Sequence, residues 1–84
     1  MHVVAEFTIE PFVEGEQGAH VLAGLAAVRS AGFEPQVDAF GSSIEGEVGP
    51  VAAAISSLID DATAAGATQV SIQLRAADQS ERLR

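Results

Sequence analysis

Residues 33–48 read FEPQVDAFGSSIEGEV, and this stretch decides the fold. Its two parts, Phe33–Phe40 and Ser42–Val48, are predicted to be strands in which apolar and polar side chains alternate. Gly41 lies between them as a turn signal, and so short a connection joins two strands into an antiparallel hairpin. Ile44 points to the buried side of the hairpin. The opposite side carries Gln36, Asp38, Phe40, Ser43, Glu45 and Glu47.

A helix is predicted on either side of this hairpin. The first spans Ala19–Ala31, with Gly32 as its C-terminal cap, and its apolar stripe comprises Val21, Leu22, Leu25 and Val28. Pro50 suits the first turn of the second helix, which ends at Gly66. The buried stripe of that helix comprises Val51, Ile55, Leu58, Ile59 and Ala62.

Two further strands, one near each end of the sequence, complete the pattern. Val3–Glu10 alternates strictly and stops at Pro11, and Gln69–Arg75 alternates with Val70, Ile72 and Leu74 inward. The order β-α-β-β-α-β predicts an α+β, ferredoxin-like fold: a four-stranded antiparallel sheet in spatial order 4-1-3-2 with both helices on one face. We expect a single domain over residues 3–75 and a polar C-terminal tail over residues 76–84.

The charge balance excludes some classes of partner. The 84 residues include 12 acidic and 4 basic side chains, a net charge of −8. Nucleic acid and anionic lipid both require a basic surface, so neither is expected as a partner. A cationic or amine-bearing ligand suits this field, although an acidic balance can also serve solubility alone.

Other features of the composition concern location and assembly. There is no cysteine, no basic leader segment at the start and no apolar run long enough to cross a bilayer. These features predict a cytoplasmic protein. Because so short a chain builds a small core, we expect it to form homo-oligomers.

The face of the sheet that the helices leave open is predicted to be acidic. It carries Glu6 and Thr8 from the first strand, and Glu6 and Glu45 lie on neighbouring central strands. Like charges side by side destabilise a sheet. A cation, an amine-bearing ligand or a proton on one carboxyl offsets this cost, and so does an ion pair with Arg75 that involves no ligand.

Metal and catalytic sites have little support in the sequence. His2 and His20 are the only histidines, and we expect both to be exposed to solvent. The chain contains no HExxH, GxxxxGK[ST] or GxGxxG motif. The two glutamates could act as general acid and base, but no nucleophile accompanies them. We therefore expect no metal, no cofactor and no enzyme activity.

Two segments resemble a known family. AEFTIEP at residues 5–11 and GSSIEGE at residues 41–47 are similar to the two signatures of small thiamine-binding proteins, which are ferredoxin-like domains. The resemblance implies non-catalytic binding of thiamine or its hydroxymethylpyrimidine moiety, for sequestration, salvage or sensing, in homodimers or homotetramers built through the sheets. Residues 12–16 are bulkier and more acidic than is usual in that family. The candidate ligand-binding residues are Glu6, Thr8, Phe40, Ser42, Ser43 and Glu45.

A different class of function stays open. The acidic sheet face could meet a partner protein in a regulatory module without any small-molecule ligand. Saturable binding of a pyrimidine distinguishes the two readings.

Overall fold

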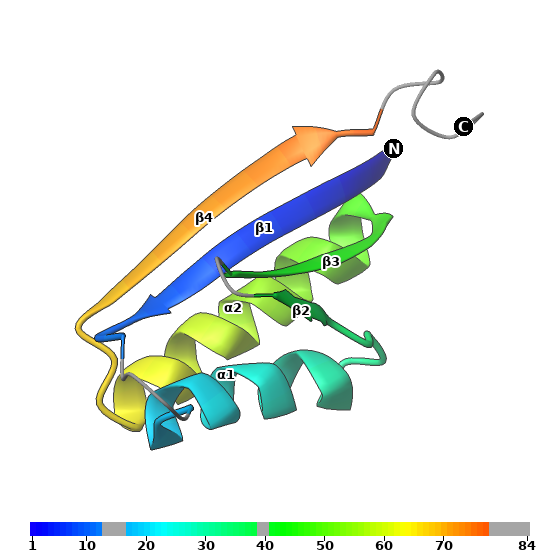
Figure 1. Cartoon of the computed structure of the whole chain (residues 1–84). Helices are drawn as coiled ribbons and strands as arrows, with labels where there is room; N and C mark the ends of the chain where they lie inside the picture. Colours follow the sequence, from blue (N-terminus) through cyan, green and yellow to red (C-terminus); the bar gives the residue numbers. More distant parts are fainter. Residues whose placement is uncertain (13–16, 39–40, 78–84) are drawn as a thin grey trace.

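The computed structural model describes residues 1–12, 17–38 and 41–77. The elements follow one another in the predicted order (Figure 1): β1 (His2–Glu10), α1 (Ala19–Ser30), β2 (Gln36–Asp38), β3 (Gly41–Glu47), α2 (Val48–Ala64) and β4 (Gln69–Ala76). The structure therefore confirms the predicted ferredoxin-like α+β fold.

The strands form one antiparallel sheet in the order β2-β3-β1-β4. β1 is central, and its Ala5 lies opposite Ile44 on β3 and Leu74 on β4. Both helices lie on the same side of the sheet (Figure 1), which leaves the other face open. The predicted strand order is confirmed, because each chain crossover returns over this one helix-covered face.

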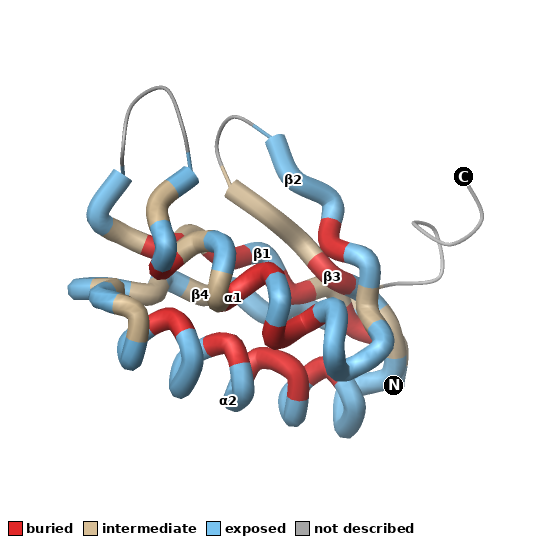
Figure 2. The backbone as a smooth tube through the Cα atoms, turned by 90° about the horizontal axis from the view of Figure 1, so that it is seen from below, coloured by how far each residue is buried: buried red, intermediate tan, exposed pale blue. Residues whose placement is uncertain are grey.

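The core lies between the sheet and the two helices. The alternation of β1 is confirmed, since Val3, Ala5, Phe7 and Ile9 are all buried against the helices. Leu25, Val28, Val51 and Leu58 are the larger helix residues that fill the layer above them, and buried segments recur along both helices in Figure 2.

Gly24 allows α1, α2 and β1 to approach closely. A Cβ atom at this position would lie 2.5 Å from Ile9 Cδ1, 3.4 Å from Leu58 Cγ and 3.6 Å from the Cβ of Ala62. Gly46 has a similar role on β3, because a Cβ there would lie 3.0 Å from Cε1 of the Phe33 ring. Glycine is therefore favoured at both positions, because any larger residue would clash with the neighbouring side chains.

Three apolar residues that we expected in the buried stripes are exposed. Leu22 on α1 is 51% exposed, Ile59 on α2 is 39% exposed and Leu74 on β4 is 46% exposed. Each lies at the flank of its element, where the narrow layer formed by two helices ends. The prediction that they are buried is therefore wrong.

Some predicted boundaries also differ. β2 comprises only Gln36–Asp38, and Phe33 instead follows α1 and packs against the core. The second helix begins at Val48, two residues before the expected Pro50. β4 continues through Ala76, and the amide of Ala77 donates to the His2 carbonyl at 2.9 Å. The first residue of the expected tail, Ala76, therefore belongs to the sheet, Ala77 is hydrogen-bonded to it, and residues 78–84 lie outside the described residues.

The expectation that both histidines are solvent-exposed is wrong. His20 is only 7% exposed, and its Nε2 donates a hydrogen bond to the Pro11 carbonyl at 2.6 Å. The side chain of His2 is 26% exposed, and its Nε2 lies 2.8 Å from Glu45 Oε2. Both rings have partners from other parts of the chain, which local sequence patterns cannot reveal.

Candidate functional site

The open face of the sheet is organised in rows of side chains that cross the strands. One row contains Gln36, Ser43, Glu6 and Gln73, because paired residues of antiparallel strands share a face. In the next row Val4 lies between Glu45 and Arg75. The open face is therefore polar, as the alternation of the strands predicted.

A hollow of about 280 Å³ lies on this face. Side chains that can accept or donate hydrogen bonds dominate its lining, and the lining residues are Glu6, Phe7, Thr8, Asp38, Gly41, Ser42, Ser43, Ser71 and Gln73. All four strands contribute, so the sheet itself forms the floor.

Gly41 helps to keep the hollow open at the start of β3. A Cβ atom at Gly41 would lie 3.0 Å from the carbonyl oxygen of Phe7 and 3.1 Å from Thr8 Cγ2. The backbone of β3 therefore approaches β1 so closely here that a side chain would crowd the wall of the hollow.

The two central glutamates have separate partners within the chain. Glu6 Oε1 lies 3.6 Å from Arg75 Nε, and Glu45 pairs with His2. Because Glu6 is opposite Ser43 and Glu45 is opposite Val4, the two carboxylates lie on a diagonal rather than face to face. The repulsion between the two glutamates that the sequence suggested is therefore offset by partners within the chain, and one of these is the expected ion pair with Arg75.

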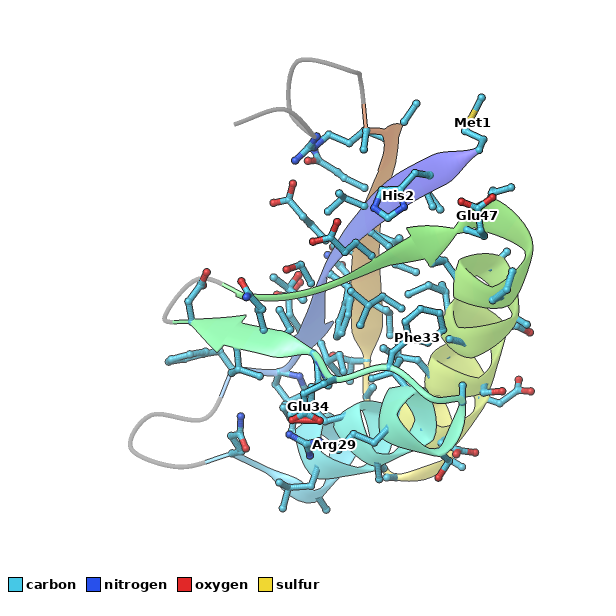
Figure 3. All side chains as sticks on the ribbon, turned by 90° about the vertical axis from the view of Figure 1, so that its right-hand side faces the viewer. Met1, His2, Arg29, Phe33, Glu34 and Glu47 are labelled. Carbon is cyan, nitrogen blue, oxygen red and sulfur yellow. The ribbon has the colours of Figure 1, made fainter. Side chains whose placement is uncertain are left out.

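These ion pairs are exposed and contribute little to folding. The side chains of Glu6 and Arg75 are 55% and 49% exposed, a setting in which an ion pair stabilises by about 0–1 kcal/mol. The end of the sheet near His2 holds a further pair, Glu47 with the Met1 amine at 3.1 Å, and Figure 3 shows Met1, His2 and Glu47 together there. Glu6 thus keeps an accessible carboxylate beside the hollow.

The structure brings most of the sequence-predicted site residues together. Glu6, Thr8, Ser42 and Ser43 line the hollow, whereas Glu45 lies outside its lining. Ser42 shares its row with buried Phe7, so its side chain is directed to the helix side and its backbone borders the hollow. Phe40 lies outside the described residues.

Three further lining residues with polar side chains were not among the candidates. Asp38, Ser71 and Gln73 complete the hollow from the two edge strands. The alternation had placed each of them on the open face, and only their positions across the sheet, which require the register, show that they meet Glu6 and Thr8.

Within residues 1–12, 17–38 and 41–77, no group of three or more His, Cys, Asp or Glu side chains is placed to hold a metal ion. In the same ranges, no helix has the length and apolar character needed to cross a membrane.

The fold and the hollow define a ferredoxin-like domain with a polar site on its open sheet face. Residues 5–84 match the family model described as thiamine-binding protein, and the chain belongs to this family. No curated protein matches the chain.

Solved structures share the fold across nearly the whole chain. A domain of unknown function (DUF77) from Bacillus cereus aligns with a TM-score of 0.70 at 20% identity, covering 98% of this chain and 86% of that one. A Thermotoga maritima protein, proposed in its description to act in thiamine biosynthesis or salvage, aligns with a TM-score of 0.57 at 15% identity, covering 99% and 96%. At these identities the likeness concerns the fold alone.

Proposed function

We propose that this protein binds thiamine or its hydroxymethylpyrimidine moiety, without chemical turnover, in the hollow on the open sheet face. The observation that carries the proposal is the acceptor-rich lining of a hollow formed by all four strands in a member of the thiamine-binding protein family. The Thermotoga maritima protein with the same fold, whose description concerns thiamine biosynthesis or salvage, adds support.

The lining offers partners for both parts of thiamine. The pyrimidine ring carries an exocyclic amine and ring nitrogens, so it both donates and accepts hydrogen bonds. Glu6 can accept from the amine, and the Gln73 amide can donate and accept at the same ring edge. The thiazolium ring carries a fixed positive charge, which the Asp38 and Glu6 carboxylates favour.

The size and charge of the hollow favour ligands without phosphate. Its volume of about 280 Å³ lies just below the usual range for small-molecule sites, which suits a single pyrimidine ring with the second ring at the rim. The lining residues include two carboxylates and no basic side chain. A diphosphate would therefore meet like charge, and we expect thiamine diphosphate to bind more weakly than thiamine.

Calorimetric titration tests the proposal directly. The chain contains neither Trp nor Tyr, so heat is a more suitable signal than intrinsic fluorescence. Thiamine and hydroxymethylpyrimidine should bind saturably, and thiamine diphosphate should bind more weakly. An absence of heat and of thermal stabilisation with all three ligands would overturn the proposal and favour the alternative of an acidic protein-interaction face.

Two charge-removing variants locate the site. Glu6→Gln removes the carboxylate beside the hollow and should weaken thiamine binding about ten- to hundredfold, since a hydrogen bond to a charged group contributes about 1.5–3 kcal/mol. Glu47→Gln is the matched control, because this similarly exposed glutamate lies on the same face but outside the lining. Equal losses in the two variants would indicate a diffuse effect of charge.

A third variant tests how far the binding site extends across the sheet. The sequence assigned Glu45 to binding, and in the structure this residue pairs with His2 one row away from the hollow. If the thiazolium ring extends over that row, Glu45→Gln weakens thiamine binding and leaves hydroxymethylpyrimidine binding unchanged. Unchanged affinity for both ligands restricts the site to the residues of the hollow.

A further inference from the structure

Arg75 is the one arginine among the described residues whose side chain belongs to the open face of the sheet. It shares a row with Val4 and Glu45. Arg29, the other arginine in this part of the chain, lies in the last turn of α1 and pairs with Glu34 (Figure 3). The open face is otherwise rich in carboxylates, so the position of this guanidinium decides which of them is partly neutralised.

The register of the strands directs Arg75 to Glu6. The residue directly opposite Arg75 on β1 is Val4, which offers no polar partner. The carboxylate beyond Val4 in the same row, that of Glu45, already lies 2.8 Å from His2. Glu6 is the diagonal neighbour of Arg75 on β1, at a spacing that long side chains can span, and its Oε1 lies 3.6 Å from Arg75 Nε. The guanidinium is therefore held beside the hollow without being part of its lining.

The ion pair leaves Glu6 able to serve a ligand as well. Both side chains are about half exposed, so the pair is weak, and a carboxylate can accept further hydrogen bonds on its two oxygens. An amine that binds to Glu6 would lie within about 10 Å of the guanidinium, which is the screening length in about 0.1 M salt. Arg75 can therefore act on the charge of a bound ligand without touching it.

We propose that Arg75 is a specificity-determining residue, which lowers the affinity of the hollow for positively charged thiamine relative to uncharged hydroxymethylpyrimidine. This inference rests on the proposed function and concerns the choice between its two ligands. The guanidinium repels the fixed charge of the thiazolium ring, whereas the pyrimidine has no net charge on which it can act.

Without Arg75, charge alone would favour many ligands. The lining of the hollow contains the carboxylates of Glu6 and Asp38 and no basic side chain, and the whole chain has a net charge of −8. Such a field attracts any small cation, whatever its shape. By compensating the charge of Glu6, Arg75 makes hydrogen bonds to the ring edge the larger part of recognition, and specificity of this kind needs a repulsive element as well as attractive ones.

Calorimetric titration of three variants with both ligands tests the inference, at a mildly alkaline pH at which the aminopyrimidine is uncharged. Arg75→Gln should bind thiamine about three- to tenfold more tightly than the natural chain, and its affinity for hydroxymethylpyrimidine should change by less than about twofold. Arg75→Lys keeps the positive charge and should keep the natural ratio of the two affinities. Arg29→Gln is the matched control, because it makes the same change in net charge away from the open face, and it should leave both affinities unchanged.

Ionic strength distinguishes an effect of charge from an effect on the shape of the hollow. The gain in thiamine affinity that Arg75→Gln produces should disappear as the salt concentration rises toward about 1 M, where the screening length falls to about 3 Å. A gain that persisted at high salt would contradict the inference, because a change in shape does not depend on screening. Circular dichroism of each variant verifies that the fold persists.

Two further results would overturn the inference and leave the proposed function in place. One is weaker binding of both ligands to Arg75→Gln, which would mean that Arg75 supports binding. The other is an equal change in both affinities, which would mean that Arg75 does not select between the ligands. If the natural chain binds neither ligand, the proposed function itself fails, and the inference fails with it.

Discussion

Replacing Gly24 by alanine should show that α1 and β1 are packed so closely that one additional methyl group destabilises their contact. Alanine in a helix interior stabilises by about 1 kcal/mol relative to glycine. At Gly24 the added Cβ would lie 2.5 Å from Ile9 Cδ1 in a buried site, and overpacking of this kind costs about 1–3 kcal/mol. We therefore expect Gly24→Ala to destabilise the protein by about 1 kcal/mol.

A second substitution isolates the cause. Ile9→Val removes Cδ1 and should by itself cost about 1 kcal/mol, because it leaves a small cavity. In the double variant the new Cβ occupies the space of the lost methyl group and the helix keeps its propensity gain. The double variant should then be about as stable as the natural chain, with a coupling energy of about 2 kcal/mol.

Urea unfolding followed by circular dichroism measures these differences, at one fixed protein concentration so that self-association does not contribute. Gly46→Ala is a useful comparison, because its Cβ would meet a different side chain, the Phe33 ring, and should show no coupling to Ile9→Val. If Gly24→Ala stabilised the protein and added independently to Ile9→Val, the argument that Ile9 restricts this position would be refuted.

Three further predictions concern stability and are measured by the same unfolding experiment. Leu58→Ala should cost about 2–5 kcal/mol, because this side chain is fully buried between the helices and the sheet; a loss below 1 kcal/mol would contradict that packing. His20→Leu should cost about 1–3 kcal/mol, because it leaves the Pro11 carbonyl without its donor, and an unchanged midpoint would show that water replaces the ring. Arg75→Ala should change stability by less than about 1 kcal/mol, since its pair with Glu6 is exposed; a larger loss would show that Arg75 has a further structural role.

The strands could be predicted from the sequence because each has one covered face. The alternation of β1 assigns Phe7 to the core and Glu6 to the open face, and both assignments are confirmed. Helical stripes are less informative. Leu22 and Ile59 recur at apolar spacing but lie at flanks, and the width of the buried stripe depends on how the two helices pack, which neither helix encodes alone.

The candidate site, too, could be predicted from the sequence only in part. The sequence indicates that Glu6, Thr8 and Ser43 share the open face, but the hollow also needs Ser71 and Gln73 from an edge strand. Their proximity to Glu6 depends on the register of the strands. The alternation of apolar and polar residues shows which face a side chain is on, but it does not show which residues lie opposite each other on neighbouring strands. Gly46 is a related case: it belongs to a family signature, and the structure assigns it to packing against Phe33 rather than to the hollow.

The hydrogen bond between His20 and Pro11 has a consequence for how the protein can change. It joins the end of β1 to the first turn of α1, so both ends of the intervening connection are held in place independently of its length. Doubling the length of a connection between fixed ends costs only about 0.6 kcal/mol in chain entropy. The connection between β1 and α1 therefore marks a place where insertions can be accommodated while the sheet and helices stay intact, and where related chains can diversify in sequence without loss of the fold.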